Sequence, residues 1–396
     1  MNLGIVSVWD ERGAGYVSKL YDEYLSEHFV VFIYNRGYSK NKFPFDQRVY
    51  NARKVGSTKP MSIHKKEFKE WIDNNKIETI LFNEQQSWEP IIWCKEWKIK
   101  IVAYIDYYTE ETVPFHDAYD LLICNTKRHL KAFKSHKNVK YYPWGTDVET
   151  FTPKNNNNKV PVFLHSCGYS PTRKGTDSLI RAFKNIDLDY KLIIHTQVDL
   201  KKALPDEIPL IENLLKSGKM ELINKTITVP GLYFLADYYV YPTKLEGIGL
   251  TIAESISSGM IPIIPNCPPM IEFLPKEHKY KIKVDRHVSR FDGYYWPQCI
   301  ISEKHLEELI NLAINDFPNK NLKSTLRKWA IKKLDFRKNF KNLESELKNL
   351  KFQKAERELI QKIKMYELNR PLTHKKILKL INKLYKFLYP IKYLFK

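Results

Sequence analysis

The stretch YPTKLEGIGLTIAESISSGMIPI, residues 241–263, decides the fold of this chain. An apolar run over 238–241 predicts a β-strand, and residues 242–249 follow it as a loop with two glycines. The next residues have helical spacing up to 258, after which a glycine provides a common C-terminal cap. A second apolar run over 261–264 predicts the following strand. The stretch therefore indicates a strand–loop–helix–strand unit of a parallel α/β sheet.

The junction between this loop and this helix is a predicted anion site. The helix is expected to begin at Leu250 or Thr251, directly after Gly249. Glycine lets a ligand approach the backbone closely, and the first amides of a helix point their N–H groups at an anion. A diphosphate fits there, with Glu246 before it and Glu254 placed to bind the two hydroxyls of a ribose. Taken alone, these residues equally fit a plain turn and a solvated helix.

Strand-like and helix-like segments alternate along most of the chain. Apolar β-type runs lie at 3–8, 30–34, 79–82, 99–104 and 121–124, and again at 162–164, 191–195, 220–223, 238–241 and 261–264. Helical spacing separates several of them, for example over 17–25 and 65–72. Such alternation predicts parallel sheets that are covered by helices on both faces.

A polar, low-complexity tract divides the two series of strands. PKNNNNKV, residues 153–160, has the composition of a linker. We therefore expect an N-terminal, acceptor-side Rossmann-like domain over 1–152, a nucleotide-sugar-binding one over 161–335, and C-terminal helices over 336–396. Two doubly wound domains would face each other across a cleft at the carboxyl ends of their strands, where open α/β sheets bind ligands.

Three motifs and one spacing carry a resemblance to a known family. Glu246 and Glu254, eight residues apart within EGIGLTIAE, resemble the E-x7-E motif of the family 4 (group 1) retaining glycosyltransferases of GT-B fold. ICNTKRHLKAF (123–133), YPWGTDVETFTP (142–153) and LHSCGYSPTRKGTDSLIRAF (164–183) resemble further segments of that family in the same order. The resemblance covers roughly residues 1–335. It implies a retaining hexosyltransferase-like enzyme that uses a UDP- or GDP-sugar, with no metal and no further cofactor.

The resemblance also implies roles for single residues. Glu246 would lie beside the transferred sugar, Glu254 would hold the ribose, and Lys174 would neutralise the donor phosphates. A lysine before a glycine at a loop–helix junction also suits a phosphate on physical grounds, although a surface lysine near a helix start has the same pattern. We expect Glu246 and Lys174 to be catalytic and assign no metal ligand. The other expected donor-binding residues are Arg173, Gly249, Leu250, Thr251, Gly13 and Gly15.

The chain departs from the family pattern at two places. Many relatives carry an arginine where Tyr169 stands, so Arg173 is the candidate second cation for the phosphates. Many also carry a histidine after the fourth strand of the first domain, where Ile105 or Asp106 stands here. His116 is a candidate substitute for that histidine, and an ordinary loop histidine is the other interpretation.

The N-terminal segment ERGAGYVSKLY places Gly13 and Gly15 between a predicted strand and a predicted helix. In the resemblance this loop faces the donor and acceptor, while a simple strand–helix turn explains the two glycines as well. A dinucleotide site would require GxGxxG. Because Ser18 stands at the third glycine position, we exclude that class of site.

Composition limits the other possibilities. The 65 basic and 45 acidic side chains give a formal charge of +20, which favours an anionic partner, although general lysine enrichment has the same effect. The five cysteines form no CxxC pair, so reduced thiols in the cytoplasm are expected. We expect neither a signal peptide nor a membrane-spanning segment, because no apolar run reaches about 18 residues.

The C-terminal part is predicted to be helical. The pattern turns helical from about Glu303, and residues 320–364 predict one or two long helices. Residues 371–396 contain no acidic side chain and combine an apolar stripe with lysines on another face. This pattern is typical of an interfacial helix on anionic lipid, at the inner face of the membrane, and equally of a helix docked on the first domain.

These observations lead to one preferred function and two alternatives. The preferred function is transfer of a sugar to a glycan or lipid-linked acceptor in polysaccharide or lipopolysaccharide synthesis. The same chemistry on a nucleic acid or protein acceptor is the first alternative. A non-catalytic nucleic-acid-binding protein, suggested by the charge, is the second and is opposed by the E-x7-E spacing.

Overall fold

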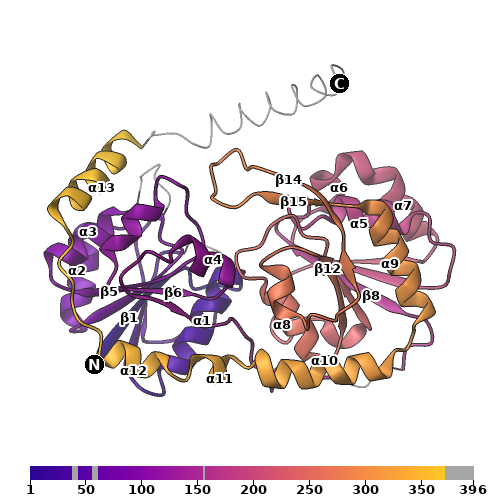
Figure 1. Ribbon diagram of the computed structural model, residues 1–396, viewed down its shortest axis with the longest axis horizontal. Coiled ribbons are helices and arrows are strands. Elements are labelled where there is room, and N and C mark those ends of the chain that lie inside the picture. Colours follow the sequence, from indigo (N-terminus) through magenta and orange to yellow (C-terminus); the bar gives the residue numbers. More distant parts are fainter. Residues whose placement is uncertain (38–42, 56–60, 155–156, 371–396) are drawn as a thin grey trace. The chain divides into compact units, whose positions relative to one another are not determined.

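The structure of this chain is a computed structural model. It describes residues 1–37, 43–55, 61–154 and 157–370. Internal contacts divide the chain into two compact units. The first comprises residues 1–104, 114–122 and the part from Asn349 onward, and the second comprises 105–113 and 123–348. The ribbon in Figure 1 shows strands and helices in both units.

The first sheet has seven strands in the order β3-β2-β1-β4-β5-β6-β7. Its strands are β1 (Asn2–Ser7), β2 (Val30–Asn35), β3 (Val49–Asn51), β4 (Thr79–Asn83), β5 (Lys100–Tyr104), β6 (Leu121–Cys124) and β7 (Val139–Tyr141). β1 pairs in parallel with β2 on one side and with β4 on the other. The chain therefore reverses its direction of winding between β1 and β4. Strands buried on both faces, such as β4, explain the unbroken apolar runs in the sequence.

The second sheet has six strands in the order β10-β9-β8-β11-β12-β13. Its strands are β8 (Val162–Gly168), β9 (Lys191–Thr196), β10 (Met220–Asn224), β11 (Tyr238–Val240), β12 (Ile261–Pro265) and β13 (Lys281–Ile282). β8 pairs in parallel with β9 and with β11, so the winding reverses again between β8 and β11. A separate antiparallel hairpin is formed by β14 (Val284–Val288) and β15 (Gln298–Ile301).

The helices follow the strands as a doubly wound fold requires. In the first half they are α1 (Gly13–Leu25), α2 (Lys65–Asn74), α3 (Glu89–Glu96) and α4 (Lys127–Ala132), with the short η1 (Val113–Ala118). In the second half they are α5 (Thr176–Phe183), α6 (Leu200–Ala203), α7 (Ile208–Lys216), α8 (Leu250–Ser257), α9 (Glu303–Asn315) and α10 (Lys320–Lys333), with the short η2 (Pro205–Glu207), η3 (Tyr233–Leu235) and η4 (Met270–Phe273). α5 packs against α7 and α9, whereas α8 packs against α10. These are the two helical layers that flank the second sheet (Figure 1).

One predicted element begins earlier than expected. α1 starts at Gly13, so Gly13 and Gly15 lie in its first turn and not in a loop before it. A Cβ atom on Gly15 would lie 1.9 Å from the carbonyl oxygen of Asp10. The chain therefore needs glycine here because the helix passes directly over the end of the preceding loop. The expected helix over 17–25 is thus too short at its N-terminus.

The C-terminal part differs more from expectation. Residues 320–364 form neither one nor two long helices but parts of four: α10, α11 (Phe336–Phe340), α12 (Leu343–Lys348) and α13 (Arg357–Asn369). The first of these breaks is tertiary in origin, because Thr146 and Gly145 pack against the backbone between α10 and α11. α13 packs on α3 in the first unit. Residues 371–396, predicted to be an interfacial or docked helix, lie outside the described residues.

Two global features concern compartment and membrane. All five cysteines are buried and free of disulfide bonds. Within 1–37, 43–55, 61–154 and 157–370, no helix combines the length and apolar character needed to cross a bilayer.

Candidate active site

The second sheet brings two distant loops together at its point of reversal. Residues 169–175 follow the carboxyl end of β8, and residues 241–249 follow the carboxyl end of β11. Since β8 and β11 are hydrogen-bonded neighbours, the two loops leave the sheet side by side. A topological switch point of this kind is where open α/β sheets bind ligands.

A glycine allows these two loops to touch. Gly175 has a φ of +71° and caps the N-terminus of α5. A Cβ atom at this position would lie 2.0 Å from the carbonyl oxygen of Pro242. The backbone of Lys244 also donates a hydrogen bond to the carbonyl of Arg173 at 2.8 Å. Lys174, between these two contacts, is therefore held by backbone packing on both sides.

Lys174 and Glu246, both expected to be catalytic, meet at this junction. The Nζ atom of Lys174 lies 2.7 Å from Oε1 of Glu246, and their side chains are only 15% and 8% exposed. The same carboxylate oxygen accepts hydrogen bonds from the Thr243 hydroxyl at 2.6 Å and the Tyr241 hydroxyl at 3.0 Å. Lys174 also contacts the Tyr241 hydroxyl. Two residues that are 72 positions apart thus form one buried polar cluster.

The charges in this cluster set its protonation. Burial by itself would raise the pKa of Glu246, but the positive charges of Lys174 and Arg173 and the hydrogen bonds outweigh burial and lower that pKa to about 2. Burial lowers the pKa of Lys174 to about 8, and the attraction of Glu246 offsets burial only in part. At neutral pH the pair is therefore a carboxylate beside an ammonium group.

The N-terminus of α8 lies in the same loop. Gly249 has a φ of +95°, a left-handed conformation that favours glycine, and α8 begins at Leu250 as expected. The first amides of a helix have no acceptor within the helix, so they remain for an anion. Thr251 follows in the first turn, where its side chain lies beside the phenols of Tyr239 and Tyr241.

Glu254, the expected ribose ligand, lies one turn further along α8. Its Oε2 atom accepts a hydrogen bond from the Tyr233 hydroxyl at 2.5 Å. Burial raises the pKa of Glu254 to about 7, and the bond from Tyr233 only partly opposes this. Nothing in the sequence indicated that Tyr233 would contact Glu254, because Tyr233 lies in the short η3 turn before β11.

The two candidate positions for a second phosphate cation have different environments. Arg173 donates from Nη1 to the carbonyl of Leu245 at 2.7 Å and lies 3.5 Å from Oε1 of Glu246. Its charge is therefore part of the same cluster. Tyr169 is 48% exposed and supplies no positive charge.

The structure adds two residues that the sequence analysis did not assign to the donor loop. Arg128, in α4, donates to the carbonyl of Glu246 and stacks over the ring of Trp296 at 5.3 Å. Asp106 lies against Gly247, because a Cβ atom there would be 1.8 Å from its Oδ1. Arg128 lies within the ICNTKRHLKAF motif, and Asp106 is one of the two residues considered at the position of the family histidine. Their contacts with the donor loop could not be read from the local sequence.

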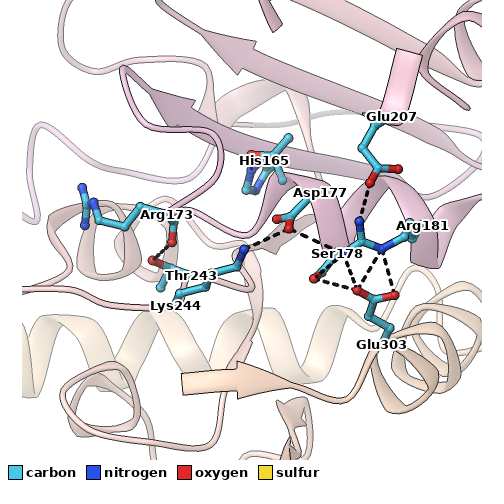
Figure 2. A network of polar contacts seen from close by, with 10 residues as sticks. His165, Arg173, Asp177, Ser178, Arg181, Glu207, Thr243, Lys244 and Glu303 are labelled. Atoms are coloured by element: carbon cyan, nitrogen blue, oxygen red, sulfur yellow. Dashed lines mark hydrogen bonds and ion pairs between the residues drawn. The ribbon is translucent and has the colours of Figure 1, made fainter. Parts of the chain in front are cut away.

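A network of partly buried polar contacts links this junction to the neighbouring helices (Figure 2). Lys244 pairs with Asp177 in α5 at 2.9 Å. Arg181, one turn later, pairs with Glu303 at the start of α9 at 2.5 Å and also contacts Glu207. These pairs connect the donor loop to α5 and α9. They therefore stabilise the positions from which Arg173 and Lys174 reach the site.

Three further candidates lie in the first unit. Gly13 and Gly15 are in the first turn of α1, where packing on Asp10 accounts for Gly15. His116, in η1, is buried with its ring 5.0 Å from that of Trp88. This packing is that of a core histidine.

Comparisons of the sequence with known proteins point to glycosyltransferases. Residues 147–323 match the family described as "Glycosyl transferases group 1". "Uncharacterized glycosyltransferase 335" of Sulfolobus islandicus rod-shaped virus 1 is 24% identical over 172 residues, 42% of this chain and 50% of that protein. The chain therefore matches only half the length of this viral relative.

Solved structures give the fold over most of the chain. A glycosyltransferase from Rickettsia africae ESF-5 has a TM-score of 0.67 and 14% identity, with 88% of this chain and 99% of that chain covered. HepE from Anabaena in complex with UDP has a TM-score of 0.69 and 13% identity, with coverages of 88% and 100%. A further structure of HepE contains UDP-glucose. The likeness confirms the predicted fold class of two Rossmann-like α/β domains with C-terminal helices.

Proposed function

We propose that this chain is a retaining, metal-independent glycosyltransferase that uses a UDP- or GDP-sugar. The observation that carries the proposal is the buried pair of Lys174 and Glu246 beside the N-terminus of α8, at the switch point of the second sheet. A diphosphate site needs positive charge and free backbone amides. Lys174 and the first residues of α8 can supply them, and both lie within residues 147–323, which match the group 1 glycosyltransferase family. We propose that residues 161–335 form the donor domain.

In the proposed reaction the donor sugar loses its bond to the diphosphate and gains one to the acceptor on the same face. The acceptor proton passes to the departing phosphate oxygen, so no enzyme nucleophile is needed. The protein's contribution is then to position the two substrates and to neutralise the leaving group. Lys174, Arg173 and the first amides of α8 supply the positive charge, and Glu254 would bind the ribose hydroxyls.

Glu246 has a different part in this proposal. Its carboxylate stays ionised because its pKa is about 2, so it can only accept hydrogen bonds. We propose that it accepts from a hydroxyl of the transferred sugar and orients Lys174. It is unsuited to donate a proton to a leaving group near neutral pH.

The acceptor is proposed to be a glycan or a lipid-linked sugar of a surface polysaccharide or lipopolysaccharide. The formal charge of +20 suits work at an anionic membrane surface on the cytoplasmic side. Residues 371–396, which contain no acidic side chain, are the proposed lipid contact. HepE, a structural relative, was solved with UDP and UDP-glucose, so uridine donors are the first to test.

The decisive experiment combines donor screening with product analysis. The purified chain is incubated with UDP- and GDP-hexoses, with and without EDTA, and release of the nucleoside diphosphate is measured. The anomeric configuration of the transferred sugar is then determined by NMR. We expect EDTA-resistant release and retention of configuration. Inverted product would refute the retaining mechanism, and no binding or turnover of any nucleotide sugar would refute the enzyme.

A further inference from the structure

The β14–β15 hairpin is separate from the second sheet, and the loop at its tip is rich in aromatic residues. Residues 289–297 connect its two strands and read SRFDGYYWP. In Figure 1 the hairpin extends away from the strands of the second sheet. Nothing in the proposed donor chemistry uses this tip.

Several contacts fix the tip to the loop after β5. The Tyr294 hydroxyl donates to the carbonyl of Asp106 at 3.0 Å, and the Tyr107 hydroxyl donates to the carbonyl of Asp292 at 3.1 Å. The rings of Tyr107 and Tyr294 are stacked at 5.4 Å. The tip and this loop therefore form one ordered surface.

This surface adjoins the donor loop. The backbone of Cys299, in β15, donates to the carbonyl of Lys244 at 2.8 Å. The Asp106 carboxylate lies directly on Gly247, next to Glu246. A ligand bound to the tip would therefore be beside the residues proposed to hold the transferred sugar.

Two groups on this surface remain available to a ligand. Phe291 is 57% exposed, although it is a large apolar side chain at an ordered position. Asp106 is half-buried, with Oδ1 packed against Gly247. An exposed ring on the tip and a carboxylate on the loop that the tip contacts together suit a sugar, whose C–H face packs on the ring while its hydroxyls donate to the carboxylate.

The local charge on this surface disfavours a polyanion. The tip contains one arginine, Arg290, and one acidic residue, Asp292, and these two side chains are paired with each other. The facing loop 105–111 contains three acidic residues and no basic one. Arg128, whose guanidinium lies 5.3 Å from the Trp296 ring, adds one positive charge beside the tip, but acidic side chains still outnumber basic ones on this surface. The surface therefore favours a neutral glycan over phosphate groups.

We propose that the hairpin tip and the loop after β5 bind the acceptor as a neutral sugar ring, stacked on Phe291 and hydrogen-bonded by Asp106. The inference rests on the proposed function and adds the acceptor subsite to it. It predicts that this surface affects acceptor use and not nucleotide binding, because the phosphate cations lie in the other loops of the site.

The test uses the full chain and the neutral octyl glycosides of glucose, galactose, mannose and N-acetylglucosamine as probes. The acceptor KM, the rate of donor hydrolysis without acceptor, and the Kd for UDP are measured for Phe291→Ala and Asp106→Asn. Phe45→Ala, which changes a 95% exposed phenylalanine, and Glu110→Gln, which changes an exposed carboxylate of the same loop, are the matched controls.

We expect the acceptor KM to rise about 10-fold in each variant, as for loss of one stacking or hydrogen-bonding contact. In Phe291→Ala, donor hydrolysis and the UDP Kd should stay unchanged, because Phe291 makes no contact with the donor loop among those described. The two controls should match the wild-type protein. An unchanged acceptor KM, or equal changes in the controls, would overturn the inference. A wild-type chain that hydrolyses its donor but transfers sugar to none of the octyl glycosides would also overturn it. A wild-type chain that neither binds UDP nor hydrolyses any donor would overturn the proposed function itself.

Discussion

Replacing Lys174 with alanine is the most informative perturbation of the proposed donor site. Its ammonium group lies 2.7 Å from the Glu246 carboxylate, and both side chains are largely buried. A charge-assisted contact to a donor phosphate is worth about 1.5–3 kcal/mol, so Lys174→Ala should raise the Kd for UDP roughly 10- to 100-fold. Isothermal titration calorimetry with UDP measures this directly.

The same substitution should also destabilise the fold, and a second variant separates the two effects. Without Lys174 the Glu246 carboxylate is buried without its closest cation, which costs about 3 kcal/mol or more when a buried pair is broken. The double variant Lys174→Ala with Glu246→Gln removes that charge. We expect its thermal stability to return toward the wild-type value while UDP binding stays weak.

A control within the same site completes the design. Lys244 is equally protected from solvent and pairs with Asp177 at 2.9 Å. Lys244→Ala should lower stability but leave the Kd for UDP within about threefold of wild type, because its ammonium group is already bound on the α5 side. Equal loss of UDP binding in Lys174→Ala and Lys244→Ala would refute the placing of the phosphates at Lys174. Full recovery of UDP binding in the double variant Lys174→Ala with Glu246→Gln would refute the same placing of the phosphates.

Three more outcomes follow from the geometry, and a fourth follows from the sequence of residues 371–396. UDP binding should be strongest between about pH 7 and pH 8, because Glu254 (pKa about 7) loses its charge below this window and Lys174 (pKa about 8) loses its charge above it. Titrations across pH 6–9 should show the acidic limb disappear in Glu254→Gln and the alkaline limb in Lys174→Met; limbs that persist would exclude these groups. Glu246→Gln should keep or tighten UDP binding, since a carboxylate beside a diphosphate is removed, yet lower transfer roughly 100-fold, measured as kcat. Gly249→Ala should cost about 1–2 kcal/mol in denaturant unfolding, because alanine disfavours a φ of +95°, and an unchanged midpoint would contradict this. Deleting 371–396 should abolish salt-sensitive binding to anionic vesicles in flotation assays while UDP binding persists; undiminished flotation would locate the lipid contact elsewhere.

The sequence by itself determined the features that depend on neighbours along the chain. Alternating apolar runs and helical spacing predicted most strands of both sheets to within a few residues, because a buried parallel strand must be apolar over its whole length. Gly249 and the helical run after it located α8 to within one residue at each end, since a left-handed glycine and a helix start are local events. The spacing of Glu246 and Glu254 indicated a resemblance to group 1 glycosyltransferases for the same reason.

Tertiary structure decided which of these pieces meet. Lys174 and Glu246 come together only because β8 and β11 are neighbours at a switch point, and no local pattern encodes strand order. The contact of Tyr233 with Glu254 likewise joins separate elements. The break between α10 and α11 lies where the chain packs on Gly145, so helical propensity alone overestimated the continuity of the C-terminal segment. Propensity and spacing act over a few residues, whereas the site is assembled by contacts between segments far apart in sequence, whose energies depend on the complete fold.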